Sequence, residues 1–71
     1  MEIKKDTILD VNHKRKGKFI GIVLEDFDSE KEEFYPIAVA QFNPVRGMAN
    51  DWEVMEKIPC RATLCEISVK K

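Results

Sequence analysis

The stretch of sequence that decides the fold spans residues 13–33 and reads HKRKGKFIGIVLEDFDSEKEE. It begins with a cluster of cations, continues through a run of aliphatic residues and ends in a run of carboxylates. Gly17 suits a tight turn between the first two parts, because glycine adopts positive φ without steric cost. The order predicts a strand, a positively charged turn, a second strand, a negatively charged loop and a third strand.

Alternation of apolar and polar residues supports further strands on both sides of this stretch. Leu9 and Val11 share one face of the first strand, whereas Asp10 and Asn12 share the other. The second strand carries apolar residues on both faces, which predicts packing contacts on each side. The expected strands are Thr7 to His13, Lys18 to Leu24, Phe34 to Ala40 and Cys60 to Val69.

Three positions modify this pattern. Gly21, in the middle of the second strand, predicts a bulge or a sharp bend. Pro36 has no N–H to donate, so the third strand is expected to begin there or to lie at an edge. Residues 48–58 fit two patterns, because Trp52 and Met55 recur at helical spacing while Trp52 and Val54 alternate as in a strand. Extended structure and a short helix are both open for this segment.

Four short strands, with residues 48–58 as a fifth where they are extended, and tight turns in 71 residues predict an all-β protein with a single domain over residues 1–71. The architecture that fits best is a small five-stranded SH3-like barrel. Two alternatives are an OB-like barrel and a bent antiparallel sheet with one short helix near residues 50–57. A chain of this size buries only about 60% of its unfolded surface, which leaves little room for a deep catalytic pocket.

Composition and net charge limit the range of possible functions further. The chain is 44% hydrophobic and 35% charged, as in a folded domain, and its formal net charge is −1. Bulk attraction to polyanions is therefore excluded, and any binding of nucleic acid must use a local cluster of cations. No apolar run has the length that crosses a bilayer, so we expect a cytoplasmic protein without a membrane partner.

The residues that usually carry chemistry are few. His13 is the single histidine, and no serine or cysteine has a recognisable base partner. Cys60 and Cys65 would point to opposite faces of one straight strand, so we expect reduced thiols, at least one of them buried. We expect no enzyme activity, no cofactor and no metal site.

Residues 6–23 resemble the start of a KOW or Tudor-type SH3-like barrel. The resemblance rests on the run Asp6 to Val11, on Lys16 and Gly17, and on Gly21 to Val23. The two glycines are four positions apart here, where the family pattern has three. The resemblance implies binding to RNA, to a nucleoprotein complex or to another protein, rather than catalysis.

The basic turn is the strongest candidate site. Closely spaced cations at the tip of a hairpin can hold phosphates, and neighbouring aromatic rings can stack on bases. The candidate phosphate contacts are His13, Lys14, Arg15, Lys16 and Lys18. The candidate stacking or partner contacts are Phe19, Tyr35, Trp52 and Arg46.

The basic turn also has a purely structural interpretation, and the protein has a second candidate function. The basic turn can instead be a solvated turn that keeps a sheet edge from pairing with other chains. Arg61 is expected to form a salt bridge with the acidic loop. The rival function is a protein-interaction module, such as an accessory or inhibitory factor of the kind that phages and mobile elements encode, which would use an acidic and apolar surface. We expect a monomer or a weak homodimer.

Overall fold

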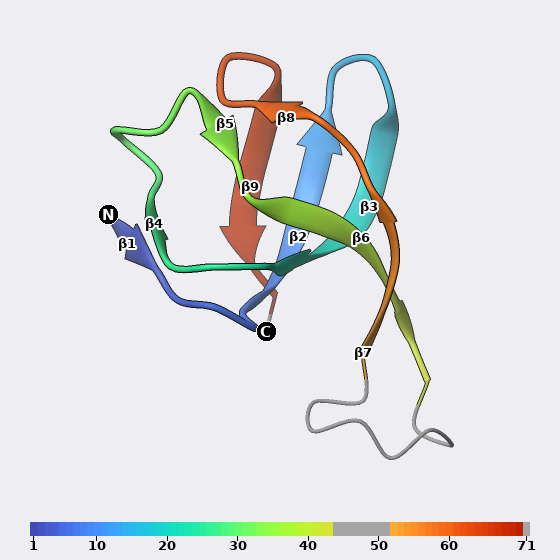
Figure 1. Cartoon of the computed structure of the whole chain (residues 1–71). Coiled ribbons are helices and arrows are strands. Elements are labelled where there is room, and N and C mark those ends of the chain that lie inside the picture. Colours follow the sequence, from blue (N-terminus) through green and yellow to red (C-terminus); the bar gives the residue numbers. More distant parts are fainter. Residues whose placement is uncertain (44–51, 71) are drawn as a thin grey trace.

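The computed structural model describes residues 1–43 and 52–70 as an all-β protein, and these residues contain no helix (Figure 1). A five-stranded antiparallel sheet has the order β7-β6-β3-β2-β9, and two two-stranded sheets pair β1 with β4 and β5 with β8. The strands are β1 (Glu2–Ile3), β2 (Ile8–His13), β3 (Gly17–Val23), β4 (Phe27–Asp28), β5 (Phe34–Tyr35), β6 (Ile37–Phe42), β7 (Trp52–Lys57), β8 (Cys60–Arg61) and β9 (Cys65–Val69).

The five-stranded sheet is strongly twisted, so that β6 runs across the direction of β2 and β9 (Figure 1). Within the described residues no sheet closes on itself, because β7 and β9 stand at the two ends of the strand order. The all-β class is confirmed, whereas a closed SH3-like barrel is not. The helix considered near residues 50–57 is wrong for residues 52–57, which form β7, and residues 50 and 51 lie outside the described part.

The main core lies on the inner face of the five-stranded sheet, where the alternation in β2 places Leu9 and Val11. The two small sheets cover this face, and they contribute Ile3, Phe27 and Cys60 to the same cluster. A second cluster lies on the outer face, around Ile22, Ala38 and Ala40. The apolar residues on both faces of β3 therefore have packing partners on each side, as the sequence predicts.

Of the two alternatives predicted for Gly21, a bulge or a sharp bend, the bulge does not form. Gly21 pairs in regular register with Leu9 on β2 and with Val39 on β6. A Cβ atom at this position would lie 2.6 Å from Cγ2 of Ile37 and 3.0 Å from Cγ2 of Val11. Glycine is required here because side chains of the inner core occupy the space above its Cα atom. The register shift lies instead between Val39 and Ala40.

Two predicted strands are each divided into two. Pro36 separates β5 from β6, and its carbonyl accepts the N–H of Leu24 at 2.7 Å. The expected strand from Cys60 to Val69 is interrupted after Arg61 by a turn, which is closed by a hydrogen bond from Leu64 N–H to the Arg61 carbonyl at 2.8 Å. This turn changes the direction of the chain, and both cysteines consequently lie in the inner core.

Candidate nucleic-acid interface

The basic turn between β2 and β3 is shaped by His13. Its side chain is only 5% exposed, and its Nδ1 atom accepts the backbone N–H groups of Arg15 and Lys16, both at 3.1 Å. Gly17 completes the turn with φ of 87°. His13 thus fixes the backbone that carries the cations, and it adds little to the surface that a ligand would meet.

Four exposed cations project from this turn and from the first residues of β3: Lys14, Arg15, Lys16 and Lys18. None of them forms an ion pair with another described residue. The situation differs elsewhere in the protein, where Lys4 lies 2.9 Å from Glu2 and Lys70 lies 3.9 Å from Asp10. The positive charge of the turn is therefore left available for an external anion.

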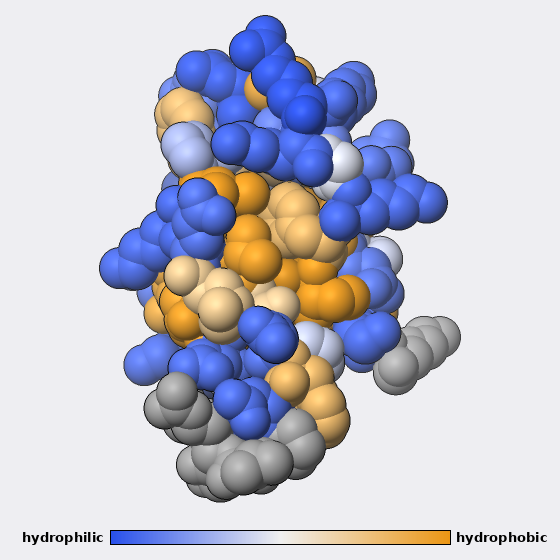
Figure 2. All heavy atoms as spheres, turned by 90° about the vertical axis from the view of Figure 1, so that its right-hand side faces the viewer, coloured by the Kyte–Doolittle hydropathy of each residue, from blue (hydrophilic) through white to orange (hydrophobic). Residues whose placement is uncertain are grey.

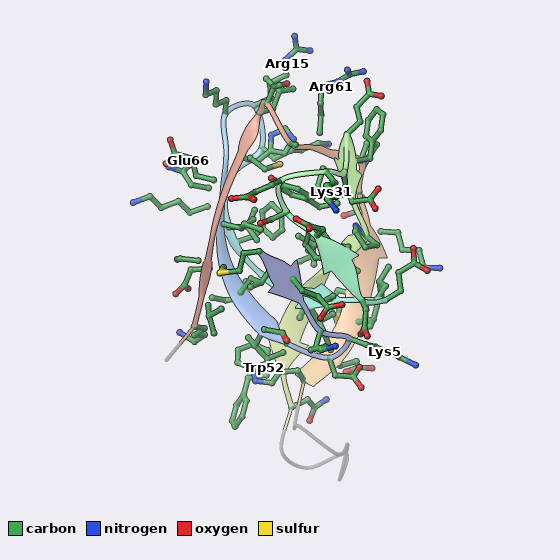
Figure 3. The ribbon with its side chains drawn as sticks, turned by 90° about the vertical axis from the view of Figure 1, so that its left-hand side faces the viewer. Lys5, Arg15, Lys31, Trp52, Arg61 and Glu66 are labelled. Carbon is green, nitrogen blue, oxygen red and sulfur yellow. The ribbon has the colours of Figure 1, made fainter. Side chains whose placement is uncertain are left out.

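A second turn lies beside the basic turn. The N–H of Lys14 donates to the carbonyl of Leu64 at 2.9 Å, which joins the basic turn to the turn between β8 and β9. Arg61 precedes this second turn, and Figure 3 places Arg15 and Arg61 at the same end of the molecule. The two turns together form one end of the structure.

Arg61 forms the salt bridge with the acidic loop that the sequence predicts, because its Nη1 atom lies 3.0 Å from Oε1 of Glu33. Its guanidinium also lies over the ring of Phe34, 4.7 Å from the ring centre, and that ring is 47% exposed. Phe34 and Arg61 are directly opposite each other in the β5–β8 pair. Sequence reasoning misses this stacked pair, because 27 positions separate its members and only the strand register joins them.

The aromatic rings predicted as stacking contacts either lie away from the basic turn or pack against other side chains. Phe19 is half-buried against the inner core. Tyr35 packs on Phe27 with ring centres 5.1 Å apart, and its hydroxyl donates to the Ser29 carbonyl at 3.1 Å. Burial raises the pKa of Tyr35 above its ordinary value. Neither ring is freely exposed beside the basic turn.

Trp52 lies at the end of the molecule opposite Arg15 (Figure 3). It packs edge-on against Phe42, with ring centres 5.3 Å apart and an angle of 65° between the rings. Arg46, the remaining candidate contact, lies outside the described residues. The structure therefore does not bring Trp52 together with the basic turn.

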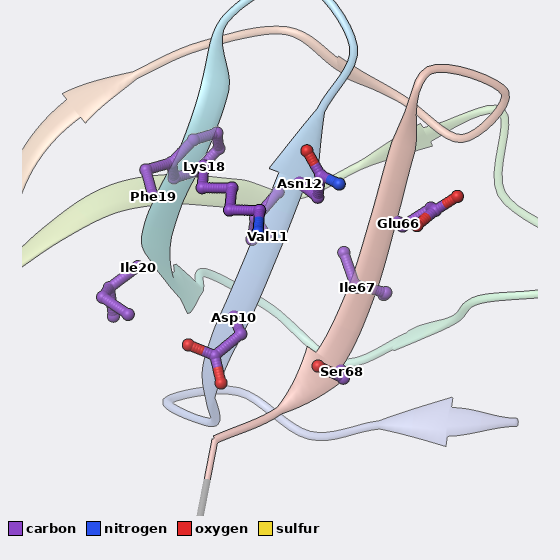
Figure 4. Close-up of a pocket in the computed structure, with 9 residues that line it drawn as sticks. All are labelled: Asp10, Val11, Asn12, Lys18, Phe19, Ile20, Glu66, Ile67 and Ser68. Atoms are coloured by element: carbon purple, nitrogen blue, oxygen red, sulfur yellow. The ribbon is translucent and has the colours of Figure 1, made fainter.

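A groove of about 690 Å³ lies on the β3-β2-β9 part of the sheet (Figure 4). The strand register places Lys18, Asn12 and Glu66 in one row across these strands, and Ile20, Asp10 and Ser68 in the next. Because the row of Lys18 also carries Glu66 and the next row carries Asp10, the groove has mixed charge. It is a poorer site for a polyanion than the turn above it.

The acidic loop is tied to the N-terminal segment. The Asp26 carboxylate accepts the N–H of Lys5 at 2.7 Å, and Asp28 lies 3.1 Å from the amino group of Met1. The N–H of Glu30, followed by the amino group of Met1, holds the pKa of Asp28 below its ordinary value. These contacts give the loop a structural role in holding β1 against β4.

Cys60 and Cys65 are both free and buried, as reduced thiols are expected to be. They do not point to opposite faces, since both side chains belong to the same inner core cluster. Burial, together with Cys65, raises the pKa of Cys60 to about 12, and burial also raises the pKa of Cys65. The described residues contain no group of three or more potential metal ligands.

Comparisons with protein-family models, with curated proteins and with solved structures gave no match. In the two described ranges, no helix has the length and hydropathy that crossing a membrane requires.

Proposed function

We propose that this protein is a non-enzymatic binding module that contacts nucleic acid, RNA in particular, or a nucleoprotein complex through its basic turn. One observation carries the proposal. Lys14, Arg15, Lys16 and Lys18 stand on a turn whose backbone is fixed by His13, and they have no ion-pair partner among the described residues. Closely spaced cations on a rigid support bind phosphates with little loss of backbone entropy.

The fold gives further support. The resemblance of residues 6–23 to KOW and Tudor-type domains falls on β2, on the basic turn and on β3, which are also the elements that build the site. An SH3-like barrel remains part of the proposal, with the β5–β8 pair as the segment that would complete the barrel wall. Domains of this kind act by binding rather than by catalysis.

The test is a binding titration with a fluorescent RNA of mixed sequence at low salt. The variant Lys14→Glu, Arg15→Glu, Lys16→Glu reverses three charges of the turn. A matched control, Lys5→Glu, Lys31→Glu, Lys57→Glu, changes the net charge equally at exposed sites elsewhere. The proposal expects the first variant to lose at least tenfold in affinity, and the control to lose much less. Absence of binding by the unmodified protein at low salt would remove the proposal.

A second candidate function is protein binding through the outer face of the sheet. Figure 2 shows apolar side chains gathered over β3, β6 and β7, in a field bordered by hydrophilic residues. Phe42 is 54% exposed and Val54 is 45% exposed, and they pair with Trp52 and Ala40 of the outer cluster. Exposed apolar surface of this kind often marks a protein contact.

The two candidate functions can be distinguished by how partner binding responds to salt, to nuclease and to substitution. A protein partner that is retained after nuclease treatment and at high salt, and that is lost on Phe42→Ser with Val54→Ser, supports the second candidate. A partner that is lost after nuclease treatment and on charge reversal of the basic turn supports the first. Val69→Ser serves as the control for an exposed apolar side chain outside the apolar field.

A further inference from the structure

The stacked pair of Phe34 and Arg61 supplies a flat, accessible surface beside the basic turn. The guanidinium lies 4.7 Å from the centre of the Phe34 ring, and the two side chains remain about half exposed. Glu33 holds Arg61 in place with a hydrogen bond of 3.0 Å. Nucleobases stack on arginine planes as they do on aromatic rings, so a half-exposed guanidinium over a half-exposed ring gives a base two planar groups to contact.

Charges of both signs lie near this surface. The exposed cations of the basic turn lie at the same end of the molecule (Figure 3), which the hydrogen bond from Lys14 to Leu64 holds next to the β8–β9 turn. The Glu33 carboxylate lies 3.0 Å from the Arg61 guanidinium, and its side chain is 72% exposed. A carboxylate repels phosphate groups but does not repel a neutral base, and it can accept hydrogen bonds from the amino groups of that base. Phosphates are thus favoured at the turn, and a base is favoured at the stacked pair.

We infer that the ligand of the basic turn is a single-stranded nucleic acid, with its phosphates on Lys14, Arg15 and Lys16 and one base stacked on the Phe34–Arg61 pair. This inference rests on the proposed function and specifies its substrate class. Single strands are selected because a base in a duplex has both faces covered by its neighbours, whereas an unpaired base has a free face.

The experiment compares a single strand of about ten nucleotides with the duplex of the same sequence, at two salt concentrations. The single strand carries 2-aminopurine at one position, because stacking quenches the fluorescence of this base. The inference expects tighter binding of the single strand, and quenching on binding. Phe34→Leu should weaken binding of the single strand roughly tenfold and leave duplex binding unchanged.

Two further variants complete the design. Phe34→Tyr keeps a ring under Arg61 and should retain both affinity and quenching, which separates stacking from a general loss of structure. Phe42→Leu removes an exposed ring at the opposite end and should change nothing. Because Trp52 lies far from the site, its fluorescence should stay constant during the titration.

Different outcomes of these experiments would overturn the inference and the proposed function. Equal affinity for single strand and duplex, with no effect of Phe34→Leu, overturns the inference, while charge reversal of the turn still tests the function. Quenching of Trp52 on binding also overturns it, because the ligand would then lie at the other end of the molecule. Absence of binding to either nucleic acid at low salt overturns both.

Discussion

The Nδ1 atom of His13 lies 3.1 Å from the backbone nitrogen of Lys16 and accepts its hydrogen bond, while the imidazole ring is buried beneath the turn. The single histidine of the chain therefore supports the backbone that carries the exposed cations of the turn. Its side chain is buried at the end of β2, and its Nδ1 atom holds the backbone of the turn.

Replacement of His13 should change both stability and binding. His13→Ala removes an acceptor for two N–H groups, and the expected loss in the free energy of unfolding is about 1–3 kcal/mol. The turn should also become less ordered, which weakens RNA binding although no exposed cation is lost. Urea unfolding and an RNA titration measure the two effects.

His13→Asn is the matched control for this loss. The side-chain oxygen of asparagine can accept backbone N–H groups two or three positions further on. It should therefore restore part of the binding affinity that His13→Ala loses. Equal affinity of His13→Ala and the unmodified protein would show that the turn does not need this support.

Gly21 tests the packing of the inner core. Gly21→Ala places a methyl group 2.6 Å from Cγ2 of Ile37, so the expected destabilisation is about 1–3 kcal/mol. The clash should be partly relieved in the double variant Gly21→Ala with Ile37→Ala, whose two effects would not add. Thermal unfolding of the four proteins in this cycle gives the coupling. Additive effects would contradict the close approach.

The thiol of Cys60 predicts a dependence of stability on alkaline pH. Its pKa is raised from 9.0 to about 12 in the folded protein, chiefly by burial, so the folded state keeps the proton that the unfolded state releases. The contribution of this group is fully present below pH 9 and is lost as the pH rises toward about 12.

The measurement is urea unfolding at pH 8 and near pH 10.5, compared with Cys60→Ala. The variant should be less stable at the lower pH and should show a smaller decrease between the two values. Parallel decreases in the two proteins would contradict a raised pKa at Cys60. The comparison cancels the contribution of the lysines, which both proteins share.

The Glu33 carboxylate holds Arg61 over Phe34 and also adds a negative charge that repels the phosphates of a ligand. Glu33→Gln removes one carboxylate beside the stacked pair and should strengthen binding of single-stranded RNA by about twofold to fivefold. Stability should change by less than about 0.5 kcal/mol, because the salt bridge is exposed on both sides. Weaker binding by this variant would indicate that Glu33 is needed to orient Arg61.

Local alternation predicts much of the sheet. Leu9 and Val11 point inward and Asp10 and Asn12 point outward, since a period of two is set by the strand itself. The same period places His13 in phase with Val11, so a signal for its burial is present in the sequence. The charge of its neighbours favours the opposite interpretation, and the packing of the sheet decides the outcome.

Contacts between distant segments are not available from local patterns. The pairing of Phe34 with Arg61 depends on the β5–β8 register. The contact between Cys60 and Cys65 depends on the turn at residues 62–64, whose sequence Ala-Thr-Leu has no glycine, proline or asparagine to indicate a turn. The candidate site could therefore be predicted at the basic turn, but not at the stacked pair beside it.

The most direct test of the account is a titration of the ¹⁵N-labelled protein with a short single-stranded RNA, followed by amide chemical shifts. We expect the largest shifts at Lys14, Arg15, Lys16 and Arg61, and no shift at Trp52. Largest shifts along Trp52–Lys57, with the basic turn unchanged, would contradict the account.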